Sequence, residues 1–285
     1  IGMAAADGTI GGEAQSDQSG AITINAASAP LSFSASNLNL RGVASTTTIS
    51  SAINTSATAD RDVTIQGTTI NLDGGITTDS GNLTFTGPVN VNGTVSVDTG
   101  NGGGSTTGGN ISFSSTLDGN DATGDNLTLT TDGTTDGTVT ITGAVGSGTK
   151  LTSLTVSAAS QVDVANVSTT GAVAITGTNI DLNTAAIASD DGAVTFTGAV
   201  DLDGGAASVD SDANDDGTDG NIQFTSTIDG GQTLGLDAST GTVTIAGAVG
   251  SGTKLTSLTV SAASQVDIAN VSTTGAVAIT GTNID

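Results

Sequence analysis

The sequence predicts an all-β fold, a right-handed parallel β-helix (β-solenoid) with about a dozen turns. A block of 45 residues, 137–181, recurs at 241–285, 104 positions later, with Ala246 for Thr142 and Ile268 for Val164. Long repeats are typical of arrays in which each unit packs on its neighbour. Pairs such as Val-x-Ile and Leu-x-Phe also recur throughout, and this alternation indicates strands rather than helices or disorder.

The composition predicts a thin, regular core. The chain has 42 Gly and five Phe, but no Trp, Tyr, His or Cys. Aromatic side chains usually supply much of the buried area of a globular domain. Here Val, Ile, Leu and Ala must supply it, which suits stacked strands better than a compact globule.

A short motif, Gly-x-Φ-x-Φ-Thr-Gly with Φ apolar, marks the predicted turns. It occurs at residues 81–87, 137–143, 171–177 and 192–198, and close variants begin at residues 61, 109, 152, 220, 241, 256 and 275. Successive starts lie 15 to 28 residues apart, which gives a five-turn long repeat of 104–110 residues. Glycine suits the corners because it adopts positive φ without steric cost. Two-sided and three-sided turns both fit these lengths.

The motif divides the chain into four segments of one continuous solenoid. Residues 1–60 form divergent turns, 61–170 the first long repeat, 171–274 the second, and 275–285 the start of a third. We expect the chain to be a fragment of a longer protein. Phe85 and Phe113 take the same place in consecutive turns, as do Phe196 and Phe224 one long repeat later. Two stacked phenylalanine pairs inside the solenoid are therefore predicted.

The charge excludes some partners. Twenty-eight acidic and four basic residues give a formal charge of −24, and the basic residues do not cluster. Phosphate binding needs clustered Lys and Arg, and an anionic membrane repels an acidic chain. We expect no nucleic-acid partner and no membrane insertion in this segment. Aspartates stacked ~4.8 Å apart would repel by about 0.9 kcal/mol in water, so a column of them would favour divalent ions or high ionic strength.

The acidic loop DSDANDDGTD is the candidate metal site. Its spacing resembles the opening of a calcium loop, in which alternate short acids supply oxygen ligands. The candidate ligands are Asp210, Asp212, Asn214, Asp216 and Asp219. Gln223 stands where an EF-hand has its bidentate Glu, and strands flank the loop, so a solvated insertion is the alternative. Residues 98–108, which correspond to this loop, have one acid, and residues 118–125 are a weaker calcium candidate.

No enzyme activity is predicted. Catalytic sites on β-helices usually need His, Lys or Arg as a base, or paired carboxylates in a cleft with aromatics to hold sugar. Lys150 and Lys254 occupy the same repeat position in GSGTK corners and fit a structural or solvated role. Outward Thr-x-Thr pairs are interrupted at equivalent positions, so they fit ordinary strand surface better than an ice-binding ladder.

Two sequence segments, GAVTFTGAV at 192–200 and LTSLTVSAA at 151–159, resemble the tandem β-strand repeats of giant bacterial surface adhesins of the filamentous-haemagglutinin type. The resemblance covers most of residues 61–285. It implies export to the cell surface or extracellular space and a fibrous architecture, and it brings no catalytic residues.

The predicted function is therefore the shaft of an exported bacterial fibre that serves adhesion or attachment between cells and surfaces. Its partners would be neighbouring repeats or copies of itself end to end, other cells, or surface glycans. Two alternatives remain open: a short filament subunit that stacks through its open edges, and a calcium-dependent binding module.

Overall fold

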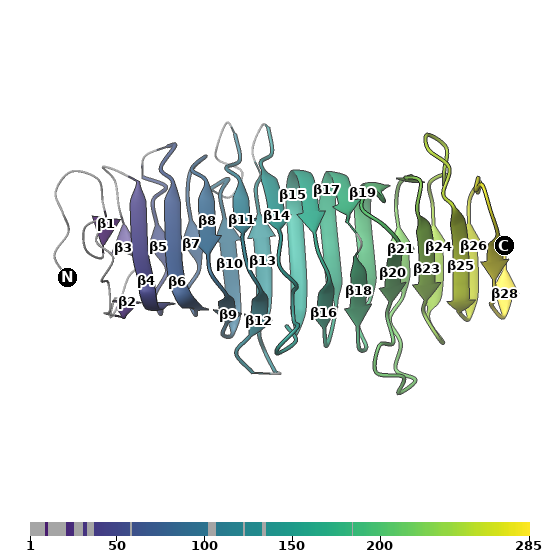
Figure 1. Ribbon diagram of the computed structural model, residues 1–285, viewed down its shortest axis with the longest axis horizontal. Coiled ribbons are helices and arrows are strands. Elements are labelled where there is room, and N and C mark those ends of the chain that lie inside the picture. Colours follow the sequence, from purple (N-terminus) through teal and green to yellow (C-terminus); the bar gives the residue numbers. More distant parts are fainter. Residues whose placement is uncertain are drawn as a thin grey trace.

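The computed structural model is a long stack of short strands, with β4 and the other early strands towards one end and the C-terminal β28 at the other (Figure 1). It describes residues 9–10, 21–25, 31–32, 37–57, 59–101, 107–121, 123–132, 135–183 and 185–285. All pairings between its named strands are parallel, and no strand is joined to a neighbour by a hairpin. The all-β parallel solenoid predicted from the sequence is confirmed. No helix of the described residues has the length and apolarity to cross a membrane.

The strands form three columns, and the chain visits columns 1, 2 and 3 in that order in every turn. Column 1 consists of β1 (Thr9–Ile10), the first halves of β4 (Leu38–Ile49) and β6 (Val63–Leu72), β8 (Leu83–Thr86), β11 (Ile111–Phe113), β14 (Thr138–Ile141), the second halves of β15 (Ser153–Val164), β17 (Val173–Leu182) and β19 (Val194–Asp201), and β22 (Ile228–Asp229). Isolated bridges continue it to Val249 and Val271.

Column 2 begins with β2 and takes the other halves of two long strands. It consists of β2 (Ile22–Ile24), the second halves of β4 and β6, β9 (Val89–Val91), β12 (Leu117–Gly119), β16 (Val167–Thr169), β18 (Ala186–Ser189), β20 (Ala207–Asp210), β23 (Thr233–Asp237), β25 (Ser257–Ala262) and β27 (Val277–Ile279). Val145 links β12 to β16 through single bridges.

Column 3 completes each turn. It consists of β3 (Leu31–Ser32), β5 (Ile53–Asn54), β7 (Ile76–Thr77), β10 (Thr94–Asp98), β13 (Asn126–Thr130), the first halves of β15, β17 and β19, β21 (Ile222–Phe224), β24 (Thr242–Ile245), β26 (Gln265–Ile268) and β28 (Asn283–Ile284). From Leu38 to Val271 the chain makes about ten turns, close to the predicted dozen. Three columns per turn decide between the two cross-sections that the sequence left open.

Alternation along each strand buries one apolar stripe inside the turns. In β6 and β17, for example, every second residue at each end is buried, while the residues between face outward. The buried Val, Ile, Leu, Phe and Ala side chains form one continuous core. Phe85 stacks on Phe113 with ring centroids 4.5 Å apart, and Phe196 stacks on Phe224 at 4.8 Å. Both predicted phenylalanine pairs are therefore confirmed.

The five-turn division of the long repeat is wrong. The motif predicts that residues 137–143 and 152–158 begin two successive turns, but they are two sides of one turn. Val139 lies in column 1 on Ile111, whereas Leu154 lies in column 3 on Leu127. The residue that follows Val139 in column 1 is Val162. The Φ-x-Φ alternation is the same on every side of a turn, so the motif marks a side and cannot count turns. The segment boundaries at 60/61, 170/171 and 274/275 remain predictions.

Buried hydroxyls close the corners between columns. Thr78, Thr99 and Thr131 follow column 3 strands and donate to the carbonyls of Gly81, Gly109 and Gly137 at 2.7, 2.6 and 3.2 Å. All three threonines are fully buried. A buried hydroxyl is costly without a partner, so these bonds satisfy both the side chain and a corner carbonyl.

Glycine is required where successive corners touch. Gly198 has φ 134°, and a Cβ there would lie 1.7 Å from the carbonyl oxygen of Gly177 in the turn before. Only glycine fits both the backbone angle and the close approach.

Candidate functional site

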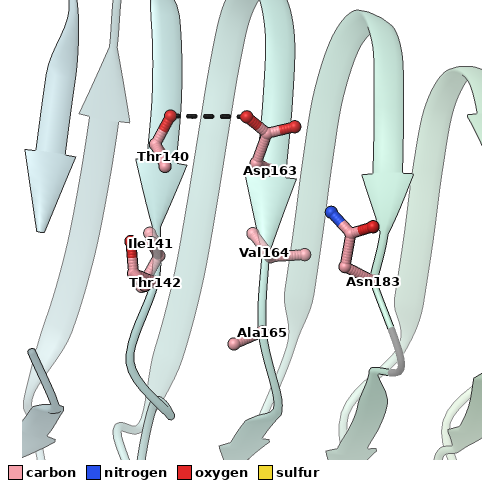
Figure 2. Close-up of a pocket in the computed structure, with 7 residues that line it drawn as sticks. All are labelled: Thr140, Ile141, Thr142, Asp163, Val164, Ala165 and Asn183. Atoms are coloured by element: carbon pink, nitrogen blue, oxygen red, sulfur yellow. Dashed lines mark hydrogen bonds between the residues drawn. The ribbon is translucent and has the colours of Figure 1, made fainter. Parts of the chain in front are cut away.

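Two shallow grooves lie on the outward face of column 1. A groove of about 380 Å³ lies over β14, β15 and β17, and Figure 2 shows Thr140, Asp163 and Asn183 along it. A second groove of about 350 Å³ continues over β15, β17, β19 and β22, with Asp181, Asp201 and Asp203 in its lining. Both are depressions between the side chains of successive turns.

Four aspartates stack along this face in consecutive turns. Asp163 pairs in register with Asp181, Asp181 with Asp201, and Asp201 with Asp229. We call these four residues the aspartate ladder. Successive members are separated by one strand spacing, ~4.8 Å, because each occupies the same outward position of its turn. The signal in the sequence is an Asp between two apolar residues, as in Val-Asp-Val at 162–164, but only the pairing shows that the four are stacked.

Hydrogen bonds and charge repulsion shape the ladder. The Gln161 side-chain amide donates to Asp163 at 3.0 Å and to Asp181 at 2.6 Å, which bridges the first two members. Burial, a hydrogen bond with Asp163 and the negative charges of Asp163, Asp203 and Asp201 raise the pKa of Asp181 to about 6. Burial and the neighbouring charge of Asp203 also raise the pKa of Asp201. Asp181 therefore takes up a proton in mildly acidic solution, and the stacked negative charges attract cations from solution.

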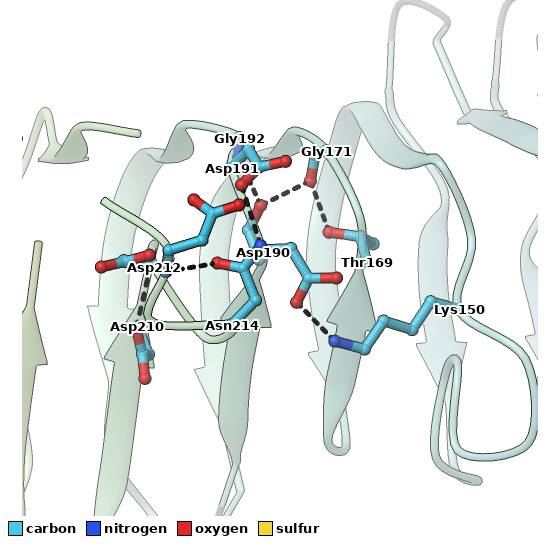
Figure 3. A network of polar contacts seen from close by, with 11 residues as sticks. Lys150, Thr169, Gly171, Asp190, Asp191, Gly192, Asp210, Asp212 and Asn214 are labelled. Atoms are coloured by element: carbon cyan, nitrogen blue, oxygen red, sulfur yellow. Dashed lines mark hydrogen bonds and ion pairs between the residues drawn. The ribbon is translucent and has the colours of Figure 1, made fainter. Parts of the chain in front are cut away.

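The predicted calcium ligands lie at the corner between β20 and β21. Asp210 ends β20 and accepts a bond from the backbone N–H of Asp212 at 3.0 Å. Asn214 turns back and donates to Asp191 at 3.1 Å, as Figure 3 shows. Asp216 is exposed and accepts from the backbone N–H of Thr218 at 2.9 Å. Asp219 accepts from the hydroxyl and backbone N–H of Thr240 in the next turn. The five residues therefore do not all point to one centre.

Asp212 and Asp219 of this loop each have a buried carboxylate oxygen without a partner. The side chain of Asp212 is only 5% exposed, and its Oδ1 atom has no hydrogen-bond partner. The Oδ1 atom of Asp219 is also buried and unpartnered. Burial, followed by contact with Asp219, raises the pKa of Asp212, although a bond from Ser239 acts in the opposite direction. Across the described part of the chain, no three acidic side chains form a group that could hold a metal ion. Calcium binding at the five predicted residues stays a prediction.

The weaker calcium candidate at 118–125 is organised around Asp125, which is 1% exposed. Its two carboxylate oxygens accept from the backbone N–H groups of Gly93 at 2.7 Å and Asp121 at 2.9 Å. This pattern ties one turn to the next. Residue 122 of this loop and residues 102–106 of the loop at 98–108 lie outside the described residues.

One ion pair joins turns along the corner between columns 2 and 3. The ammonium of Lys150 lies 2.5 Å from a carboxylate oxygen of Asp190, two turns further on (Figure 3). The counterpart of Lys150 in the second copy, Lys254, is exposed. Partly exposed pairs of this kind contribute little to stability, roughly 0–1 kcal/mol.

No known protein family, curated protein or solved structure matches this chain. Its class therefore follows from the fold alone: it is a parallel β-solenoid repeat protein.

Proposed function

We propose that this chain is part of the structural shaft of an exported bacterial surface or extracellular fibre, which serves adhesion or attachment between cells and surfaces. The observation that supports this most is the uninterrupted stacking of three strand columns from Leu38 to Val271. Ten turns at ~4.8 Å each give a rise of about 48 Å for 234 residues, so length grows in proportion to the number of repeats.

The mechanical role follows from how the turns are joined. Each turn bonds to the next through backbone groups in three columns, and buried hydroxyls and apolar side chains fill the space between. Bending or cutting the shaft requires several of these columns to separate together. The charge of −24 keeps neighbouring shafts apart, because like-charged surfaces repel. The proposal includes no catalytic activity; its partners are other repeats, cell surfaces or glycans.

Electron microscopy of source material tests the proposal. A gold-labelled antibody against residues 137–181 should also recognise 241–285, because the two copies differ at two positions. We expect label at regular intervals along thin fibres at the cell surface, and a very long chain on a denaturing gel. A short chain in the same fibres would instead indicate a subunit that stacks end to end. Label confined to compact soluble particles would contradict both fibre models.

Calcium-dependent binding is a second candidate function. The observation that favours it is the buried, unpartnered Oδ1 atom of Asp212 beside Asp219, within a loop that carries five aspartates. Buried carboxylate oxygens without donors are costly unless a proton or cation satisfies them.

Thermal melting with and without calcium tests this second candidate. If calcium binds there, Ca²⁺ should raise the melting temperature, and the Asp212→Asn variant should lose that rise. Asp216→Asn is the matched control, since Asp216 is exposed and only accepts a local backbone bond. No effect of calcium or EDTA on the unmodified chain would rule out the calcium function.

A further inference from the structure

The two copies of the 45-residue block lie on different sides of the solenoid. In the first copy Val139 lies in column 1, paired with Ile111. Its counterpart 104 residues later, Val243, lies in column 3, paired with Ile222. Val145 lies in column 2, whereas its counterpart Val249 lies in column 1. In both comparisons the residue of the second copy lies one column earlier than its counterpart in the first copy: column 1 is replaced by column 3, and column 2 by column 1.

The shift fixes the number of turns in one repeat. From Val139, column 1 continues through Val162, Ile180 and Val200 to Ile228, which completes four turns. The chain then passes columns 2 and 3 and reaches Val243. One repeat of 104 residues is therefore four and two thirds turns, with a rise of about 22 Å at ~4.8 Å per turn.

Features outside the 45-residue block show the same shift. The Phe85–Phe113 pair lies in column 1, and the Phe196–Phe224 pair lies in column 3. The buried corner hydroxyls move as well. Thr78, Thr99 and Thr131 close the corner between columns 3 and 1, whereas Ser211 closes the corner between columns 2 and 3 by donating to Gly220 at 2.8 Å. The phenylalanine pairs, the corner hydroxyls and the 45-residue block are all displaced by one column, so the shift belongs to the whole repeat.

We infer that the sequence repeat and the coil are out of phase by one third of a turn, so that a shaft built from this repeat presents the same surface at three successive corners. Three repeats, 312 residues, make fourteen whole turns and about 67 Å of rise before the surface returns to its first corner. The positions of the two copies are independent of any function, whereas the consequence for partners rests on the proposed shaft.

The corner that carries Lys150 illustrates the consequence. Residues 146–150 lie between columns 2 and 3, and the backbone N–H of Gly148 donates to Asp118 at 2.8 Å. Residues 250–254 have the same support, since Gly252 donates to Asp229 at 2.7 Å, but they lie between columns 1 and 2. Gly146 and Gly250 have φ angles of 70° and 69°, so the two corners share one shape.

This display fits partners that approach from several directions, such as separate protein molecules around the shaft. A flat partner, for example a bilayer or a crystal face, would meet a given corner only in every third repeat. Side chains that recur once per repeat therefore cannot form an unbroken stripe along one side.

Distances between spin labels test the phase directly, and the absence of cysteine makes the labelling specific. Thr140→Cys/Thr244→Cys labels the same outward position of both copies. If the copies were in phase over five turns, the labels would lie about 24 Å apart on one side. With the one-third shift, the rise is ~22 Å and the midpoints of two adjacent sides of ~17 Å lie about 8 Å apart, so the backbones alone are again separated by about 24 Å. The labels, however, point outward from different sides, about 120° apart, and labels that reach about 7 Å from the backbone would lie about 30 Å from each other.

Thr155→Cys/Thr244→Cys is the matched control. Both positions lie in column 3, four turns apart, so about 19 Å is expected. The exposed pair Ser147→Cys/Ser251→Cys repeats the measurement if a strand variant folds poorly. A Thr140/Thr244 distance near 24 Å would overturn the phase shift and leave the shaft proposal standing. Compact particles in the electron micrographs would contradict the shaft proposal and leave the phase shift standing.

Discussion

Removing one charge from the aspartate ladder should stabilise the protein at neutral pH. Asp181 lies between Asp163 and Asp201 in the stack, and its pKa is raised from 3.8 to about 6. The carboxyl therefore binds its proton more tightly in the folded chain than in the unfolded chain. Its contribution favours folding fully below pH 3.8 and is lost as the pH rises through 6.

The size of the effect follows from the shift. A change from 3.8 to about 6 corresponds to about 3 kcal/mol at 1.36 kcal/mol per unit. Asp181 is partly exposed, so screening by solvent reduces this to about 1–2 kcal/mol. The Asp181→Asn variant keeps an oxygen that accepts from Gln161 and removes the charge. Its free energy of unfolding at pH 7 should exceed that of the unmodified protein by about 1–2 kcal/mol, and the difference should vanish near pH 3.

Urea denaturation at pH 3, 5 and 7 measures this difference. Asp216→Asn is the matched control, because Asp216 is exposed in the corner loop and lies outside the ladder. It should change stability by no more than about 0.5 kcal/mol. High salt should reduce the gain from Asp181→Asn, since screening weakens the repulsion. Equal stability of Asp181→Asn and the unmodified protein at pH 7 would refute the ladder as a source of strain.

Three further variants test the packing of the turns. Gly198→Ala should lower the free energy of unfolding by about 2–4 kcal/mol in urea denaturation, because φ is positive and the new Cβ would clash with Gly177 of the preceding turn. Gly93→Ala is its control: φ is also positive but the space is open, so the free energy of unfolding should fall by only about 1–2 kcal/mol. Phe113→Ala should cost about 3–5 kcal/mol by opening a cavity in the phenylalanine stack, and a loss below 1 kcal/mol would contradict its burial. Thr131→Val should cost about 1–3 kcal/mol by removing the hydroxyl that donates to the Ala158 carbonyl, while the Gly137 carbonyl keeps its bonds from Ser160; hydrogen exchange at this corner is the readout.

The all-β solenoid and the inward and outward side of each strand follow from the amino-acid sequence alone. Alternation with a period of two fixes which side chains are buried, and this is why both phenylalanine pairs were predicted correctly. The acidic loop is also evident from the sequence, but the sequence does not show that Asn214 turns away to Asp191 or that the Oδ1 atoms of Asp212 and Asp219 are buried without a partner.

Which strand stacks on which is evident only from the pairing of the strands in three dimensions. The same Φ-x-Φ pattern occurs on all three sides of a turn, so residues 137–143 and 152–158 look like successive turns although they share one. The aspartate ladder and the one-third shift between copies depend on this pairing. Strand pairing is set by corner lengths and by contacts between turns, such as Gly198 against Gly177, and these are not encoded in the local alternation of any one strand.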